Sequence, residues 1–215
     1  MAGLEEWFEQ NRQTLESAYL AAEEPWRQSG FSGPEDRWNR LRKPIAECVD
    51  RAGTFLDIGC ANGYLLECVV RWCAERGVEV VPYGLDLSRK LVDLAALRLP
   101  QFASHLFVGN AWTWVPPRQF DFVRTELVYV PEALRREYVD RLLRLFVKPG
   151  GKLLVAEYRS RSEAGAQPWL TDELGRWGVD VERARSGYDA EGRELTRVIE
   201  CRRVGERGVS GSWPA

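Results

Sequence analysis

A short apolar run that ends in a tight glycine turn constrains the fold of this chain more than any other feature. Residues 54–58 have the sequence T-F-L-D-I, and Gly59 and Gly63 follow before helical spacing begins at Tyr64. Glycine lets the backbone turn sharply and approach a ligand closely. The N-terminus of the following helix offers free N–H groups to an electron-rich ligand. The sequence therefore predicts a buried strand, a ligand-binding turn and a helix in direct succession.

Strands and helices alternate through the middle of the chain. Strand-like runs lie at 54–58, 78–85, 104–108, 120–124 and 152–157, and helical spacing lies at 64–76, 90–98 and 133–146. This alternation implies parallel strands with helices on both faces of one sheet. After a short helix at 169–177, two further β-type runs at 179–186 and 195–202 flank a polar turn with Gly192. They predict a C-terminal antiparallel hairpin.

The first 50 residues are expected to form a helical extension. Apolar residues recur every three or four positions from Leu4 to Ala22, as in an amphipathic helix. The pattern breaks at 25–33, and Ser32 with Glu35 has the form of a capping box for a second helix. Pro44 should kink or restart that helix.

Composition excludes several classes of protein. The formal net charge of -2 over 215 residues gives no overall attraction to a polyanion, which argues against a nucleic-acid partner. With one His and five Cys, none in a C-x-x-C pair, a zinc site is not expected. The odd number of cysteines and the lack of an export signal favour a cytoplasmic location. No apolar run is long enough to predict a membrane span.

Polar residues follow the second and third predicted strands. A carboxylate at Asp86 can accept both ribose hydroxyls of a nucleoside, although it can also cap the next helix. The amide of Asn110 can accept from an adenine amino group or simply close a turn. The turn spacing of Gly59 and Gly63 does not match a dinucleotide site, because Tyr64 stands where the third glycine is needed.

Five motifs in order resemble those of the class I S-adenosylmethionine (SAM)-dependent methyltransferases. They are F-L-D-I-G-C-A-N-G at 55–63, G-L-D-L-S at 84–88, G-N-A at 109–111, F-D-F-V at 120–123 and V-K-P-G-G-K-L at 147–153. The resemblance covers residues 50–160 and, more loosely, the hairpin. It implies a Rossmann-like α/β fold with a seven-stranded, mostly parallel sheet of order 3-2-1-4-5-7-6. The methyltransferase domain is expected at 51–204. Residues 1–50 are expected to form the extension or lid, because methyl transfer needs a covered, dry site, and residues 205–215 are expected to form a flexible tail.

The resemblance also implies a set of cofactor-binding residues. Those expected around the methionine part of SAM are Asp57, Gly59, Cys60, Ala61, Gly63, Arg124 and Thr125. Asp86 would hold the ribose, Leu87 and Trp112 would flank the adenine, and Asn110 and Ala111 would meet its edge. Ala61 replaces the usual glycine, so either its φ is negative or the ligand lies slightly further away. Asn110 replaces the usual Asp, which should weaken the adenine contact.

The reaction expected is methyl transfer from SAM to an O or N atom, with S-adenosylhomocysteine (SAH) as product and no metal. Glu126 and Tyr129, after the fourth strand, are the candidate bases; Glu126 can instead bind the SAM amino group or cap a helix. Trp26 and Phe31 are expected to line the acceptor pocket, and Trp7 and Phe8 to pack in the core.

The sequence also limits the choice of acceptor. Residues 124–127 read R-T-E-L rather than the N/D-P-P-aromatic run of enzymes acting on exocyclic amines, and no Pro-Cys occurs. A small-molecule acceptor is therefore favoured. A protein or RNA acceptor, and a non-catalytic SAM-binding protein, stay open as alternatives, and the sequence leaves the oligomeric state undetermined.

Overall fold

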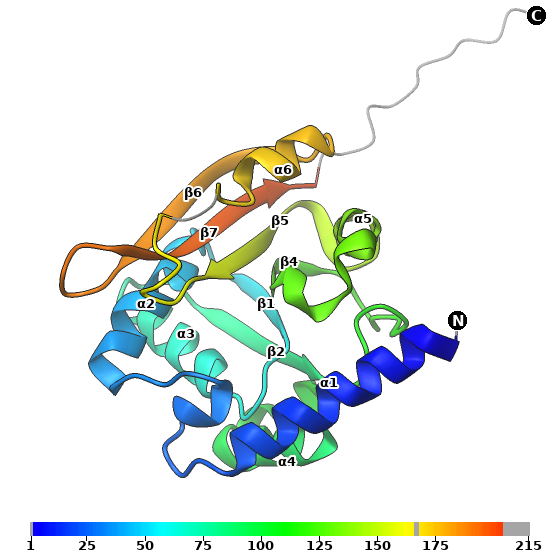
Figure 1. Ribbon diagram of the computed structural model, residues 1–215, viewed down its shortest axis with the longest axis vertical. Helices are drawn as coiled ribbons and strands as arrows, with labels where there is room; N and C mark the ends of the chain where they lie inside the picture. Colours follow the sequence, from blue (N-terminus) through cyan, green and yellow to red (C-terminus); the bar gives the residue numbers. More distant parts are fainter. Residues whose placement is uncertain (1, 166–167, 204–215) are drawn as a thin grey trace, which may run out of the picture.

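A seven-stranded sheet of order β3-β2-β1-β4-β5-β7-β6 forms the centre of the computed structural model, which describes residues 2–165 and 168–203 (Figure 1). The strands are β1 (Gly53–Ile58), β2 (Val80–Asp86), β3 (Leu106–Val108), β4 (Phe120–Thr125), β5 (Val147–Tyr158), β6 (Asp180–Tyr188) and β7 (Glu194–Arg202). Strands β1 to β5 pair in parallel, whereas β7 pairs antiparallel with both β5 and β6. The predicted α/β fold, strand order and C-terminal hairpin are confirmed.

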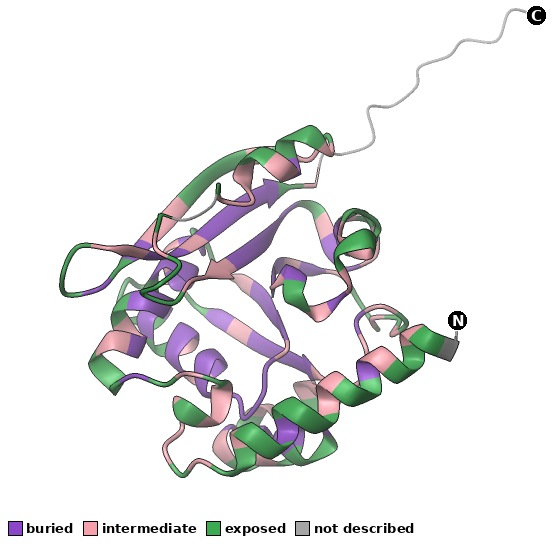
Figure 2. Cartoon of the chain, viewed as in Figure 1, coloured by how far each residue is buried: buried purple, intermediate pink, exposed green. Residues whose placement is uncertain are grey.

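Helices cover both faces of this sheet. They are α1 (Ala2–Leu20), α2 (Glu35–Glu47), α3 (Tyr64–Ala74), α4 (Arg89–Arg98), α5 (Arg135–Leu145) and α6 (Thr171–Arg176). Short 3₁₀ helices lie at Arg27–Ser29, Pro100–His105, Leu127–Tyr129 and Glu132–Leu134. Side chains alternate across a strand, so Phe55 of β1 packs with α2 and α3, whereas Leu56 and Ile58 pack with α5 on the other face. The central strands β1, β2 and β4 are accordingly buried almost throughout, whereas the edge strand β6 is mostly exposed (Figure 2).

The two N-terminal helices have different environments. α2 belongs to the core, because its residues Trp38 and Ile45, together with Val49 just after the helix, pack against the sheet and α3. α1 crosses the molecule beside α4 and carries mostly exposed side chains (Figures 1 and 2). The extension is therefore one core helix and one peripheral helix.

The predicted capping box at Ser32 is wrong. α2 begins at Glu35, Pro34 occupies its N-cap position, and no side chain caps the helix. The Glu35 carboxylate instead accepts a hydrogen bond from the Tyr64 hydroxyl at 2.7 Å. A tertiary contact to α3 thus takes the side chain that the local pattern assigned to the cap. Pro44 lies within α2, where it lines the buried face.

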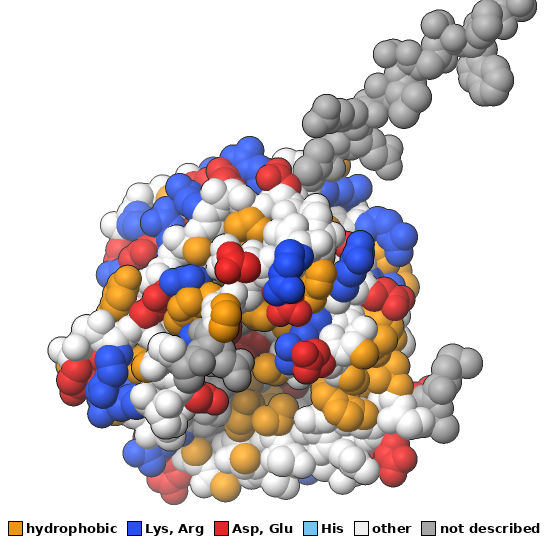
Figure 3. All heavy atoms as spheres, turned by 45° about the horizontal axis from the view of Figure 1, so that its top comes forward, with side chains coloured by type: hydrophobic (Ala, Val, Ile, Leu, Met, Phe, Trp, Pro, Cys, Tyr) orange, Lys and Arg blue, Asp and Glu red, His pale blue; other side chains and the backbone are white. Residues whose placement is uncertain are grey.

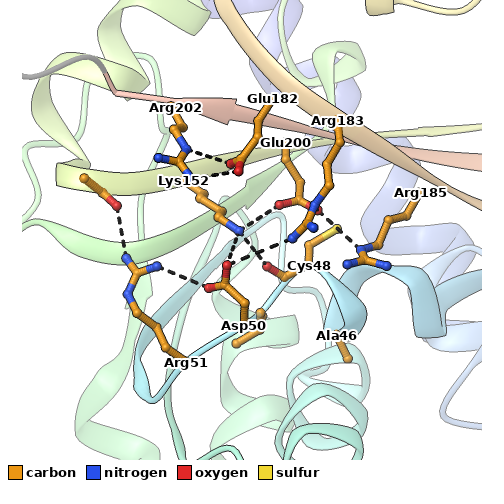
Figure 4. Close-up of polar contacts among 12 residues, drawn as sticks. Ala46, Cys48, Asp50, Arg51, Lys152, Glu182, Arg183, Arg185, Glu200 and Arg202 are labelled. Carbon is orange, nitrogen blue, oxygen red and sulfur yellow. Dashed lines mark hydrogen bonds and ion pairs between the residues drawn. The ribbon is translucent and has the colours of Figure 1, made fainter.

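A buried ion network joins the amino end of β5 to the C-terminal hairpin (Figure 4). The Lys152 ammonium donates to Glu200 at 2.8 Å and to Asp50 at 2.6 Å. Glu200 also pairs with Arg183 and Arg185 from β6. Both Lys152 and Glu200 are buried, and each has partners of opposite charge, as buried charges require. The network fixes β6 and β7 against β5.

No helix in residues 2–165 and 168–203 is long and apolar enough to cross a membrane. The predicted tail at 205–215 lies outside the described residues.

Candidate active site

The glycine turn lies at the carboxyl end of β1, where parallel strands of such sheets place their ligands. Gly59 and Gly63 have φ values of 75° each, which favour glycine. Ala61 also has a positive φ, 46°. Of the two alternatives the negative φ is therefore wrong, and a ligand slightly further from the turn stays a prediction. A non-glycine residue in this region costs about 1–2 kcal/mol. Its N–H donates to the Asp86 carboxylate at 2.9 Å, which helps to hold the turn in this conformation.

Asp86 stands at the carboxyl end of β2 and faces the same turn. One carboxylate oxygen accepts from the Ala61 N–H, and the other accepts from the Ser88 N–H at 2.9 Å. Ser88, not Asp86, is the N-cap of α4, since its hydroxyl accepts from the Leu91 N–H. Burial raises the pKa of Asp86 above its usual range. The two backbone bonds orient the carboxylate and leave lone pairs on both oxygens for further donors.

Asp57 and Arg124 form a buried ion pair between β1 and β4. They are partners in the strand register, and Arg124 Nη1 donates to Asp57 Oδ1 at 3.0 Å. Asp57 Oδ2 has no hydrogen-bond partner among the described residues. Burial raises the pKa of Asp57 to about 6, even beside this guanidinium. A buried oxygen without a donor is unusual and marks a place where a ligand donor would fit.

Arg124 connects this pair to three further side chains. Its Nη2 donates to Glu126 and, at 2.9 Å, to the Tyr158 hydroxyl, and Nη1 reaches the Tyr129 hydroxyl at 3.2 Å. Tyr129 in turn donates to Glu126 at 2.9 Å. A Cβ at Gly59 would collide with the Tyr129 ring, so this network closes directly over the glycine turn.

These residues share one cavity of about 420 Å³. The predicted residues that line it are Asp57, Gly59, Cys60, Ala61, Asp86, Leu87, Asn110, Ala111, Trp112, Arg124, Glu126 and Tyr129. Figure 3 shows hydrophobic side chains gathered on one face of the molecule around a hollow. The cavity volume falls within the range of about 300–1,000 Å³ typical of small-ligand sites.

The family model of the methyltransferase domain matches residues 34–198. The chain belongs to this family. Its sheet is that of the class I SAM-dependent methyltransferases, and the match spans β1 to β7 with α2. No curated protein matches the chain in sequence.

Solved structures show how widely this fold is shared. Magnesium protoporphyrin IX methyltransferase ChlM from Synechocystis PCC 6803, solved with SAH, superposes with a TM-score of 0.63 at 15% identity, over 91% of this chain and 99% of that one. The glycopeptide N-methyltransferase MtfA gives a TM-score of 0.58 at 18% identity, over 77% and 90%. The [4+2]-cyclase SpnF gives 0.56 at 18%, over 78% and 82%. Because a cyclase shares the fold, the family match rather than the fold identifies the chain as a methyltransferase.

Two predicted cofactor residues of this methyltransferase lie outside the cavity lining. Gly63 allows close helix packing, since a Cβ there would lie 2.9 Å from the Ala95 side chain of α4. The Thr125 hydroxyl is buried and lies 2.8 Å from the Tyr138 hydroxyl. Both residues support the site from behind rather than line it.

Trp26 and Phe31 do not line the cavity either, contrary to expectation. The Trp26 indole donates to the Gly33 carbonyl at 3.0 Å, and its ring packs near Tyr64. Phe31 packs edge-on against Trp38 with ring centroids 5.6 Å apart. Both rings extend the core around α2 and α3, and this segment meets the cavity through Ser29 and Gly30 instead.

α1 supplies the missing wall of the cavity. Its lining residues are Trp7, Phe8, Asn11, Arg12, Leu15, Glu16 and Tyr19. Trp7 and Phe8 pack against the core as expected, but they also face the cavity, which the sequence interpretation missed. Glu16 attaches α1 to the site: it accepts from the Ser88 hydroxyl at 2.6 Å and pairs with Lys90 at 2.9 Å.

Asn110, Glu126 and Tyr129 all lie at the cavity, with constrained side chains. The Asn110 side-chain oxygen accepts from the Trp112 N–H at 2.9 Å, so it closes a turn while facing the cavity. Burial raises the pKa of Tyr129 well above its usual range. Tyr129 therefore keeps its proton near neutral pH and acts as a donor to Glu126, which leaves Glu126 as the better candidate base.

Proposed function

We propose that this methyltransferase transfers the methyl group of SAM to an O or N atom of a small molecule, leaving SAH. The observation that carries the proposal is the convergence of Asp57, Asp86 and the glycine turn on one cavity at the carboxyl edge of the sheet. SAM consists of an amino acid and a ribose that are connected by a sulfonium-bearing chain. Carboxylates and a closely approaching backbone are the groups that such a ligand requires. ChlM and MtfA, which are named as porphyrin and glycopeptide methyltransferases, give small-molecule precedents on this fold.

The residues present fit the parts of SAM. The Asp57 Oδ2 atom without a partner suits the amino group of the methionine part. Asp86 faces the cavity with lone pairs free for ribose hydroxyls. Leu87 and Trp112 offer apolar surface for the adenine ring, and Ala111 is buried beside them. When bound, SAM supplies the activated methyl group, and the cavity side chains align an acceptor and exclude water.

Glu126 is the proposed base or acceptor ligand. Its carboxylate lies at the cavity, beside the Tyr129 hydroxyl and the Arg124 guanidinium. A base is needed only where the acceptor must lose a proton before attack, as a phenol or an ammonium does. Arg124 would then hold the carboxylate in place.

Incubation with SAM and a panel of phenols, carboxylic acids and amines tests the reaction. We expect a mass gain of one methylene on at least one acceptor, unaffected by EDTA, because no cluster of potential metal ligands is found within the described ranges. Glu126→Gln should lower turnover about 100-fold if Glu126 is the base. SAM binding with no transfer to small molecules, proteins or RNA would favour a non-catalytic SAM-binding protein instead.

We further propose that α1 acts as a lid over the bound cofactor. α1 lines the cavity, yet most of its side chains are exposed and Glu16 provides its polar attachment to α4. Segments with few buried contacts open at low cost and commonly gate sites. We expect SAH to slow amide hydrogen exchange in α1 more than in α6, which has no contact with the cavity. Equal exchange of α1 with and without SAH would show that it is a fixed wall.

A further inference from the structure

Arg42 of α2 is a buried cation that lines the cavity. Its residue is 9% exposed, and its guanidinium carbon lies 3.5 Å from the Tyr158 ring centroid, 4.9 Å from that of Trp38 and 5.4 Å from that of Phe31. Aromatic faces attract a cation, but they supply no oxygen for its five N–H donors. Within the described part of the chain, Arg42 has no hydrogen bond or ion pair from its guanidinium.

The other cations at the cavity are balanced by carboxylates. Arg12 pairs with Glu9 and Glu16, and Arg124 pairs with Asp57 and Glu126. Arg42 is therefore the lining cation that the described residues leave without an ion-pair partner, and the Glu126 carboxylate acts on it only through the longer-range Coulomb interaction. Burial lowers the pKa of Arg42, in line with the cost of holding a charge away from water without a partner.

The strand register places the Arg42 guanidinium beside the site. Asp57 of β1, Arg124 of β4 and Leu154 of β5 lie side by side in register, and Tyr158 follows Leu154 on the same face. This is the face that α2 covers. The Arg42 guanidinium stacks on Tyr158, whose hydroxyl accepts from Arg124. The unpaired cation thus stands beside the Asp57–Arg124 pair, where a ligand would lie.

We propose that Arg42 binds a carboxylate of the ligand in this cavity. The planar guanidinium fork matches a carboxylate with two parallel hydrogen bonds. That carboxylate has two possible sources: the amino-acid part of the cofactor, in which case the inference rests on the proposed function, or an acid group on the acceptor. Stacking on Tyr158 holds the fork in one orientation, so little freedom is lost when the anion binds.

Calorimetry on Arg42→Met separates the two sources. SAH carries the amino-acid part, whereas 5′-methylthioadenosine lacks it. If the carboxylate belongs to the cofactor, Arg42→Met should weaken SAH binding about 10- to 100-fold and leave methylthioadenosine binding unchanged. If it belongs to the acceptor, both nucleosides should bind as before, and benzoate and 4-hydroxybenzoate should bind the wild-type SAH complex but not that of the variant.

Arg37→Met is the matched control. Arg37 also lies on α2, with its guanidinium carbon 5.5 Å from the Phe31 ring, but it does not line the cavity. The Arg37→Met variant should bind every ligand with wild-type affinity. Removing a buried charge that has no ion-pair partner should leave the melting temperature of Arg42→Met unchanged or raised, whereas a purely structural role would lower it. Arg42→Lys keeps the charge but not the planar guanidinium fork. It should weaken binding of the same ligand less than Arg42→Met does.

Three results would overturn the proposal: unchanged binding of SAH and of both aromatic acids in Arg42→Met, an equal loss of SAH and methylthioadenosine, or a lowered melting temperature without selective loss. If the wild type binds neither nucleoside, the proposed function fails instead. Binding of aromatic acids to the wild type and not to Arg42→Met would then still support the anion site.

Discussion

Replacing Arg124 by methionine is expected to lower the free energy of unfolding by about 3–5 kcal/mol at neutral pH, because it removes one partner of a buried ion pair. The side chains of Arg124 and Asp57 are 3% and 1% exposed. Without Arg124, Asp57 Oδ1 loses its donor, and Oδ2 already lacks one in the described structure. An ionised carboxylate would then be buried with neither of its oxygens paired.

The same variant should regain stability as the pH falls. Burial raises the pKa of Asp57 to about 6, above the value of about 3.9 for an unfolded chain. Loss of the guanidinium raises this pKa further. A raised carboxyl pKa means that the folded state binds the proton more tightly, so its contribution to stability is present at low pH and lost as the pH rises through the folded pKa. The deficit of Arg124→Met should therefore be smaller at pH 5 than at pH 8.

Arg40→Met provides the control for this experiment. Arg40 pairs with Asp36 at 2.8 Å, but both side chains are exposed, so its loss should cost less than about 1 kcal/mol. Denaturant unfolding at both pH values measures the effect, and adding Asp57→Asn should recover part of the loss by removing the buried charge. A cost for Arg124→Met no larger than that for Arg40→Met would contradict the account.

Replacing Asp86 by alanine is expected to weaken SAM and SAH binding about 10- to 100-fold, since hydrogen bonds to a charged group contribute about 1.5–3 kcal/mol. The carboxylate faces the cavity from the carboxyl end of β2. It also accepts from the Ala61 and Ser88 N–H groups. The variant should therefore also lose about 1–3 kcal/mol of stability, because those buried donors lose their acceptor.

Calorimetry and thermal melting on the same samples separate the two effects. Asp93→Ala, an exposed carboxylate on α4, should change neither quantity. Asp86→Asn keeps one oxygen acceptor and should lie between the wild type and Asp86→Ala in affinity. Wild-type affinity in a folded Asp86→Ala protein would limit the role of Asp86 to holding the turn.

The strands and the site edge were predictable because they depend on local pattern and on rules of chain connection. The run at 54–58 and the alternation after it determine a parallel sheet, and residues that follow its strands must meet at one edge. Asp57, Asp86 and Asn110 accordingly line one cavity. Strand ends shifted by a few residues: β3 begins at Leu106 rather than 104, because the 3₁₀ helix Pro100–His105 takes the preceding residues.

The wall of the site was less predictable, because it depends on tertiary packing. Trp7 and Phe8 are apolar residues on a helix, a pattern that fits a core and a cavity wall equally well. The φ of Ala61 is stabilised by the hydrogen bond from its N–H to Asp86, 25 residues away along the chain. Arg42 did leave a signal: it follows Trp38 by four residues and so shares the apolar face of α2 with Ile45. A charged residue on a buried helix face indicates a partner elsewhere.

The central claim is that the cavity holds SAM, and calorimetric titration of the wild-type protein with SAH, SAM and NAD tests it most directly. The turn places Gly59, Ala61 and Gly63 around the end of β1, a spacing that lacks the third glycine of a dinucleotide site. The account predicts saturable binding of SAH and SAM at one site and no binding of NAD. Binding of NAD without binding of either SAM or SAH would contradict it.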